Sequence, residues 1–317
     1  MVEEGRLSTV AGIPAGEMPA AATRESPLRV PLLRCLRVKQ WIKNLFVFAG
    51  LIFTLDRGHS WESWLHAAMG FFVFSCLSGA VYIINDIVDV ERDRRHPVKR
   101  FRPIAAGEIP VRFAAVFAVA LALMSIGAGL TLGMPFGAVA TTYFVITLAY
   151  SFWLKHIVIV DLMTIAAGFV LRAAAGSLVV HVPISPWLLV CTTLLALFLG
   201  LTKRRSELAT LQHGAGQHRR ILEEYTREML DQMITVIMAC TLMAYALYTF
   251  YSRTAKGHPS LMATLPFVIY GLFRYLYLVH RKNAGGSIAS ELLEDRPLLV
   301  GIFLWIAACA IIMSVAP

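Results

Sequence analysis

Hydrophobic residues in this chain gather into long runs that polar segments separate. Nine runs approach the roughly 20 residues that an α-helix needs to cross a bilayer. They cover approximately residues 41–55, 65–90, 112–132, 134–152, 157–180, 186–202, 231–252, 260–280 and 297–316. The first is short and would have to tilt or extend at its N-terminal end. Strands of a membrane β-barrel would be about half as long. The pattern therefore predicts an all-α, polytopic membrane protein with about nine transmembrane helices.

Composition agrees with this fold class. The chain of 317 residues is 57% hydrophobic and only 15% charged, whereas a soluble domain carries roughly 25% charged residues. Residues 1–30 are rich in Ala, Gly, Pro, Glu and Ser and hold no apolar run, so we expect a disordered cytoplasmic tail there. Residues 31–317 are expected to form one membrane domain. Its two longest polar connections, 91–111 and 203–230, lie four runs apart, which suggests two halves of four helices plus one extra helix.

Basic residues predict the orientation of the chain in the membrane. The segment before the first run and the loops after runs two, four, six and eight hold nearly all of the Lys and Arg residues. The odd-numbered loops hold only Arg57, Arg253 and Lys256. The positive-inside rule places the N-terminus and the even-numbered loops in the cytoplasm. The net charge of +9 thus indicates topology and phosphate binding. No nucleic-acid partner is expected, because the basic residues are divided among several loops.

An acidic segment follows the second run. Asn85, Asp89 and Asp93 are spaced i, i+4 and i+8, which places them on one stripe of a helix, with Asp86 one residue off it. Carboxylates at a membrane boundary are costly and usually functional, although a solvated helix end with paired charges gives the same pattern. We predict that Asp86, Asp89 and Asp93 are the catalytic, Mg²⁺-binding residues and that Asn85 orients or supplements them.

Basic residues come directly after the acidic segment. Lys99, Arg100 and Arg102 are candidates for a diphosphate clamp, because arginine matches phosphate oxygens bidentately. They also serve as a positive-inside anchor, and one residue can do both.

Further candidates lie at the predicted cytoplasmic ends of other runs, where interfacial anchoring remains an alternative. Charges inside a span generally face the protein interior or pair with each other. The candidates for contact with substrate or phosphate are Lys43, Tyr150, Lys155, Asp161, Arg172, Lys203, Arg204 and Glu207. Of these, Asp161 and Arg172 are expected to face one cavity, with Arg172 three turns deeper.

These motifs make the chain similar to a known family. Nine spans, Asn85-Asp86-x-x-Asp89-x-x-x-Asp93 after the second and Tyr150…Leu154-Lys155 after the fourth resemble the UbiA superfamily of intramembrane prenyltransferases over residues 33–317. The resemblance implies a central cavity that opens to the cytoplasm, where the acidic motif binds Mg²⁺ and the substrate diphosphate. It also implies a place in the cytoplasmic membrane of a bacterium.

One departure narrows the resemblance. Ordinary members carry a second Asp-rich motif after the sixth span, where this chain has Lys203-Arg204-x-x-Glu207-Leu208. With Lys39-Gln40-Trp41-x-Lys43-Asn44 and Lys99-Arg100-x-Arg102-Pro103, this is similar to the decaprenyl-phosphate phosphoribosyltransferase branch. That branch implies Mg²⁺-dependent transfer of 5-phosphoribose from phosphoribosyl pyrophosphate to a polyprenyl (decaprenyl) phosphate. Pyrophosphate is released, and the product is a precursor of cell-wall arabinan.

Other functions remain open from the sequence. A prenyltransferase that moves an isoprenoid from its diphosphate to an aromatic or lipid acceptor is the nearest alternative. A cation-coupled transporter fits less well, because the acids cluster at a boundary and no pair of broken helices is evident. A non-catalytic subunit that binds lipid phosphate is the third. The sequence also leaves the oligomeric state open, a homo-oligomer included.

Overall fold

The computed structural model describes residues 29–211, 222, 224–281 and 294–314, and every regular element in this part of the chain is a helix. The elements are α1 (Arg29–Cys35), η1 (Val38–Phe48), α2 (Ala49–Ile52), η2 (Leu55–Arg57), α3 (Trp61–Val88), α4 (Val90–Arg95), η3 (Lys99–Phe101), α5 (Val111–Thr131), α6 (Met134–Phe152), η4 (Leu154–His156), α7 (Val160–Val179), α8 (Pro186–Leu211), α9 (Arg227–Tyr251), α10 (Arg253–Gly257), η6 (Pro259–Thr264), α11 (Leu265–Arg281) and α13 (Arg296–Ser314). The predicted tail, apart from residues 29 and 30, lies outside the described residues.

In the part of the chain that the structure describes, eight helices are long and apolar enough to cross a membrane. They are α3, α5, α6, α7, α8, α9, the segment Pro259–His280 that joins η6 to α11, and α13. These eight coincide with the second to the ninth apolar runs of the sequence. The all-α, multi-span membrane fold is therefore confirmed.

The first apolar run differs from a regular span. It forms the 3₁₀ helix η1 followed by the short α2. A 3₁₀ helix rises about 2.0 Å per residue against 1.5 Å for an α-helix, so Val38–Ile52 covers roughly 28 Å. That length nearly matches the ~30 Å hydrocarbon core of a bilayer. Extended winding thus lets a short segment reach almost across the membrane.

Small residues let η1 and α2 pack tightly against α7. A Cβ atom added to Gly176 of α7 would lie 1.9 Å from the carbonyl oxygen of Val47, and one added to Gly50 would lie 2.9 Å from the backbone of Ser177. Only glycine permits such close approach of two backbones. The small-residue stretch that ends α7 therefore fixes the first segment in the middle of the bundle.

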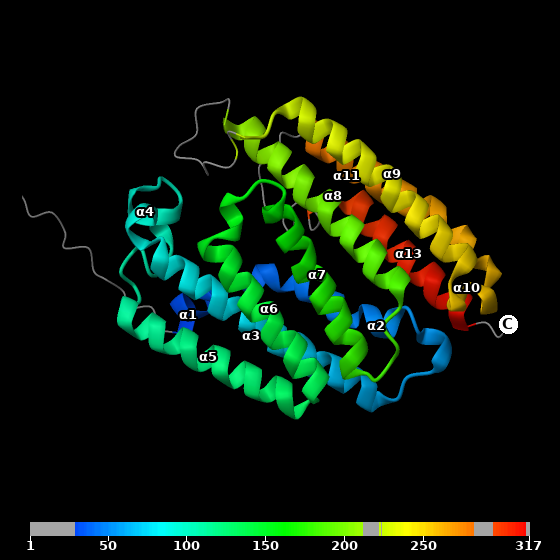
Figure 1. Ribbon diagram of the computed structural model, residues 1–317, viewed down its shortest axis with the longest axis horizontal. Helices are drawn as coiled ribbons and strands as arrows, with labels where there is room; N and C mark the ends of the chain where they lie inside the picture. Colours follow the sequence, from blue (N-terminus) through cyan, green and yellow to red (C-terminus); the bar gives the residue numbers. More distant parts are fainter. Residues whose placement is uncertain (1–28, 212–221, 223, 282–293, 315–317) are drawn as a thin grey trace, which may run out of the picture.

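The core has two main parts. One contains Val47, Leu51, Phe74, Leu77 and Phe136, which come from η1, α2, α3 and α6. The other joins α7, α8, α9, α11 and α13 through residues that include Leu162, Phe198, Leu230, Tyr275 and Leu298. Figure 1 shows α3, α5, α6 and α7 on one side and α8, α9, α11 and α13 on the other. This division agrees with the two groups of four helices suggested by the sequence.

The helices give the molecule two distinct ends. In Figure 1, α4, the connection between α6 and α7, and the C-terminal end of α8 lie toward the upper left. α2, the connection between α7 and α8, and α10 lie toward the lower right. The 28 residues of α3 extend roughly 42 Å, more than the hydrocarbon core requires. The last turn of α3 therefore reaches the boundary of the apolar region.

Candidate active site

Two carboxylates meet where α3 ends. Asp86 lies in the last turn of α3 and is 2% exposed, and Asp93 lies in α4 and is 1% exposed. Both accept hydrogen bonds from Nη1 of Arg102, at 3.0 Å from Asp86 Oδ1 and 2.6 Å from Asp93 Oδ2. Arg37 donates to the same oxygen of Asp86 at 2.5 Å. We call Asp86, Asp93, Arg102 and Arg37 the acidic-pair site.

A nearly continuous helix brings the two carboxylates together. The backbone amide of Asp89 donates to Asn85, and that of Asp93 donates to Asp89, so the hydrogen-bond pattern continues through the junction of α3 and α4. Asp86 and Asp93 are seven residues apart, which is two turns on one face. The pair therefore joins Asp93 of the expected stripe to Asp86, which lies one residue off that stripe. Asn85 and Asp89 are half-buried beside the pair, and their side chains make no hydrogen bond or ion pair to the described residues.

Arg102 is held with part of its guanidinium unused. Nη1 contacts both carboxylates, while Nε and Nη2 donate to no residue in the part of the chain that the structure describes. The side chain is 28% exposed. An arginine edge of this kind can donate two parallel hydrogen bonds to a phosphate. The expected role of Arg102 in phosphate binding thus has a geometric basis.

The donor set fits Mg²⁺. The described residues contain no group of three His, Cys, Asp or Glu side chains that could hold a metal ion. Mg²⁺ needs only one or two carboxylates when substrate phosphates and waters complete its shell. Asp86 and Asp93 already direct one oxygen each at a single cationic nitrogen, which stands where a cation between them would be. The two carboxylates can therefore hold a metal together with a phosphorylated substrate.

A second cationic group lies deeper in the bundle. Arg172 of α7 is 6% exposed and donates to Asn44 Oδ1 at 2.6 Å, to the Tyr143 hydroxyl at 2.7 Å and to the Gly168 carbonyl at 2.8 Å. Tyr143 also contacts the hydroxyl of Ser78. Ser78 precedes Asp86 by eight residues of α3, or about 12 Å.

No carboxylate among the described residues contacts Arg172. Lys43 is half-buried and lies within electrostatic range of both Arg172 and Arg37. A buried cation without an anion is costly. Cations thus extend from the acidic pair toward the centre of the bundle, where a negatively charged ligand would compensate them.

Arg204 forms a different kind of site. It is 1% exposed and donates from Nε to Asp161 at 2.9 Å, from Nη1 to Glu207 at 2.5 Å and from Nη2 to the Tyr150 hydroxyl at 3.3 Å. All three nitrogens have partners. Tyr225 also donates to Asp161, at 3.1 Å. We call Arg204, Asp161, Glu207 and Tyr150 the Arg204 cluster, and its geometry indicates a structural tie between α6, α7 and α8.

This cluster corrects one expectation. Asp161 is fully buried and paired with Arg204, so it does not face an open cavity beside Arg172. The two residues belong to separate groups, because α8 supplies Asp161 with a partner that spacing within α7 cannot reveal.

The other predicted residues lie at the same end of the bundle. Arg100 is exposed and stacks on Phe101 at 4.8 Å from the ring centroid. Lys99 in η3 and Lys155 in η4 are half-buried. Lys203 lies 3.6 Å from Glu207 and its side chain is 38% exposed. Of the three basic residues predicted after the acidic segment, Arg102 contacts both carboxylates.

Arg37, Tyr143 and Tyr225 take part in these groups although the sequence did not single them out for the site. Arg37 has the left-handed backbone angles φ 50° and ψ 53° between α1 and η1, an uncommon conformation outside glycine. In the sequence, Arg37 is marked only by its position among the basic residues before the first apolar run, and that position indicated an anchor at the membrane surface. Burial raises the pKa of Tyr225 to about 12, so its hydroxyl stays protonated as a donor to Asp161.

Comparison with known proteins agrees with the fold and the motifs. Residues 44–292 match the model of the UbiA prenyltransferase family. A decaprenyl-phosphate phosphoribosyltransferase of Mycobacterium tuberculosis is 33% identical over 87% of this chain and 92% of its own. One from Corynebacterium glutamicum is 34% identical over 90% and 87%. The structure of a UbiA homologue from Archaeoglobus fulgidus bound to GPP and Mg²⁺ superposes with a TM-score of 0.68 at 20% identity, covering 90% of this chain and all of that one.

Proposed function

The chain belongs to the UbiA prenyltransferase family, and we propose that it transfers 5-phosphoribose from phosphoribosyl pyrophosphate to a polyprenyl phosphate. The family membership and the relatives named phosphoribosyltransferases make it a membrane transferase. The choice of substrates is the proposal. One observation carries it: the cations Arg172 and Lys43 extend inward from the acidic pair, where a donor with a second phosphate would compensate them.

Asp86 and Asp93 would hold the metal, and Asp89 and Asn85 lie beside them to orient it or its waters. A relative of the same fold is described as bound to Mg²⁺, and the donor set here suits that ion. When bound, Mg²⁺ would neutralise charge on the pyrophosphate and ease its departure. Arg102 and Arg37 would orient the pyrophosphate oxygens on the same side.

Transfer requires little acid–base chemistry from the protein. The bond between ribose C1 and the pyrophosphate oxygen breaks, and the electron pair leaves with pyrophosphate. A bond forms between C1 and an oxygen of the lipid phosphate. That oxygen is already anionic, so no strong general base is needed. Positioning and electrostatic stabilisation would supply most of the rate.

The interior of the bundle supports a sugar phosphate over an isoprenoid at this site. Arg172, Lys43 and Asn44 extend inward from the acidic pair. An isoprenoid chain needs an apolar wall, whereas a cationic and hydroxyl-rich wall suits a 5-phosphate and ribose hydroxyls. A prenyl diphosphate donor would leave these buried cations without an anion.

Lys203 offers a site for the acceptor. Its side chain is more exposed than those of Glu207, Arg204 and Asp161 and lies at the same end of the bundle. A lysine ammonium there can attract the lipid monophosphate, while the polyprenyl chain lies along the bilayer-facing helices. We place this end in the cytoplasm, in the inner membrane of a bacterium, because the basic loops lie there.

The test is a transfer assay with purified protein in lipid nanodiscs. Radiolabelled phosphoribosyl pyrophosphate and a polyprenyl phosphate are supplied with Mg²⁺ or with EDTA, and the organic-extractable label is counted. We expect label in the lipid only with Mg²⁺. Consumption of a prenyl diphosphate without any phosphoribosyl transfer would contradict the proposal and indicate an ordinary prenyltransferase.

A further inference from the structure

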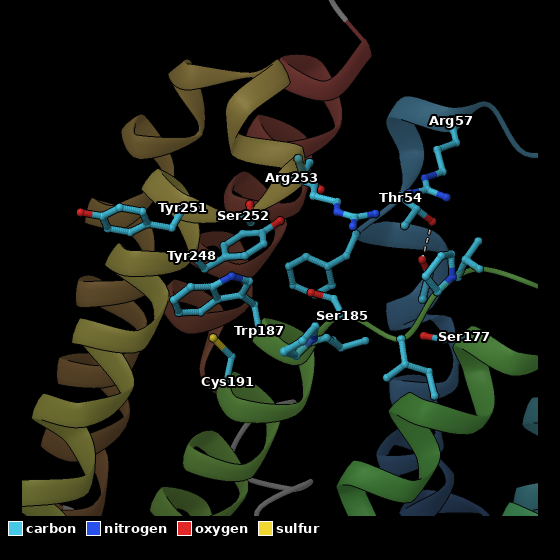
Figure 2. Close-up of a pocket in the computed structure, with 18 of the residues that line it drawn as sticks. Thr54, Arg57, Ser177, Ser185, Trp187, Cys191, Tyr248, Tyr251, Ser252 and Arg253 are labelled. Carbon is cyan, nitrogen blue, oxygen red and sulfur yellow. Dashed lines mark hydrogen bonds between the residues drawn. The ribbon is translucent and has the colours of Figure 1, made fainter.

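A cavity lies at the end of the bundle away from the acidic-pair site. Its volume is about 380 Å³, and its walls come from α2, the connection between α7 and α8, the end of α9 and the start of α10. This volume is in the range of small-molecule sites. Figure 2 shows the cavity between the segment that carries Thr54 and Arg57 and the segment that carries Tyr248 to Arg253.

Among the residues that the structure describes, the charged ones that line this cavity are Arg57 and Arg253. Both arginines are exposed. Neither makes a hydrogen bond or an ion pair with any residue that the structure describes. In Figure 2 their guanidinium groups project from opposite sides toward the same mouth. Two arginines that converge on one mouth form a site for an anion with several oxygens, such as a phosphate.

Below the arginines the wall is largely apolar. Phe53, Trp187, Leu188, Cys191 and Tyr248 line it. Phe53 stacks edge to face on Tyr248 at 5.6 Å between ring centroids. A site with a cationic mouth and an aromatic wall matches an amphiphile, whose charged head stays at the mouth and whose chain contacts the rings.

The positive-inside rule does not explain why arginines lie at this end of the bundle. The end of the bundle to which they belong has few basic residues: the odd-numbered loops hold Arg57, Arg253 and Lys256. Two of these three converge on the cavity although they come from opposite halves of the chain. Orientation in the membrane needs no positive charge at this end. Their convergence therefore indicates a ligand.

We propose that this cavity binds the phosphate headgroup of a membrane lipid, with the guanidinium groups of Arg57 and Arg253 on the phosphate and the lipid chain along Phe53, Trp187 and Tyr248. Lipid headgroups are the phosphates available where spanning helices end, and soluble phosphate would make no use of the aromatic wall. The site is separate from the proposed transfer reaction, and its existence does not depend on that reaction.

The experiment measures binding, without turnover. Delipidated protein is titrated with phosphatidic acid, and bound lipid is counted by native mass spectrometry for the wild type and for Arg57→Gln/Arg253→Gln. We expect the double variant to bind about tenfold or more weakly at this site, because it loses two charge-assisted contacts. The matched control is Lys256→Gln, which removes a charge from the same end but outside the cavity wall, and it should bind as the wild type does.

Further binding measurements distinguish a lipid phosphate from inorganic phosphate, and the cavity from the acidic-pair site. Phosphatidylcholine should bind equally to the wild type and the double variant, since its choline neutralises the headgroup. Inorganic phosphate should not displace phosphatidic acid, and Arg57→Lys/Arg253→Lys should keep part of the affinity. Asp86→Asn should leave this binding unchanged, because Asp86 lies at the other end of the bundle from the cavity. Equal binding of phosphatidic acid by the wild type and the folded Gln variant, or its displacement by inorganic phosphate, would overturn the proposal.

Discussion

Two arginines in this molecule each lie between two carboxylates, yet their surroundings differ. Arg102 contacts Asp86 and Asp93 through one nitrogen and is 28% exposed. Arg204 contacts Asp161, Glu207 and Tyr150 through all three nitrogens and is 1% exposed. The first retains donors and access, and the second retains neither. An arginine between acids is thus a candidate ligand-binding group only where part of its hydrogen-bonding capacity remains unused.

This difference suggests that the acidic-pair site serves the reaction and that the Arg204 cluster serves folding stability. A buried ion pair contributes little net stability compared with apolar residues of the same size, but removal of one partner is strongly destabilising. We therefore expect changes in the acidic-pair site to reduce transfer in a folded protein. Changes in the Arg204 cluster should instead reduce folding stability.

The largest effect is expected from Asp86→Asn. The amide keeps the shape of the side chain but removes a carboxylate from the proposed metal site, so transfer should fall by about 100- to 1,000-fold. The assay is phosphoribosyl transfer at saturating Mg²⁺, with thermal unfolding measured in parallel. Asp231→Asn is the matched control, because Asp231 of α9 forms an ion pair with Arg205 of α8, apart from the acidic-pair site. Wild-type transfer rates in Asp86→Asn at high Mg²⁺ would contradict the proposal that Asp86 binds the metal.

The second effect is on stability. Arg204→Met leaves Asp161 buried without its cation and should lower the free energy of unfolding by about 3–5 kcal/mol. Arg204→Met combined with Asp161→Asn should recover part of that loss, because the uncompensated charge is gone. Thermal unfolding in one detergent compares the three proteins. An unchanged melting temperature together with lost transfer would contradict the structural role and move Arg204 to the substrate site.

A smaller effect is expected from Arg102→Lys. Lysine keeps the positive charge but cannot touch both carboxylates and still present a second edge to phosphate. The KM for phosphoribosyl pyrophosphate should rise about tenfold, with a smaller change in kcat. Arg94→Lys is the control, since Arg94 pairs with Glu91 on the surface. A kinetic profile identical to the wild type would show that the unused edge of Arg102 does not contact the donor.

The smallest effect is expected from Lys203→Gln. The ammonium of Lys203 is partly exposed and screened, so its loss should raise the KM for the polyprenyl phosphate by roughly threefold. The KM for the soluble donor should stay constant. Initial rates at varied lipid and fixed donor measure the difference. Equal changes for both substrates would argue against a specific role of Lys203 in binding the acceptor.

The sequence predicted the spanning helices well, because apolar length alone decides whether a segment can cross a bilayer. It located the second to the ninth span and expected the first to be unusual. It did not predict the 3₁₀ winding of η1 or the close contact between Val47 and Gly176. Contacts of this kind join residues far apart in the chain and leave no local pattern.

The candidate site was predicted only in part, because its contacts also join residues that are far apart in the chain. Spacing along one helix singled out Asp86, Asp89 and Asp93 but could not show which of them meet, and the structure joins Asp86 and Asp93 through Arg102. Composition could not reveal that Arg37 reaches Asp86 from another element or that Arg204 neutralises Asp161. Periodicity describes one helix at a time, whereas partners on different helices are decided by packing.

A donor competition tests the central claim most directly. Phosphoribosyl pyrophosphate and a prenyl diphosphate are offered together, with polyprenyl phosphate and Mg²⁺, and the lipid products are identified by mass spectrometry. We predict that polyprenyl phosphate gains one phosphoribosyl group and that the prenyl diphosphate remains unchanged. Consumption of the prenyl diphosphate while polyprenyl phosphate gains no phosphoribosyl group would contradict the account.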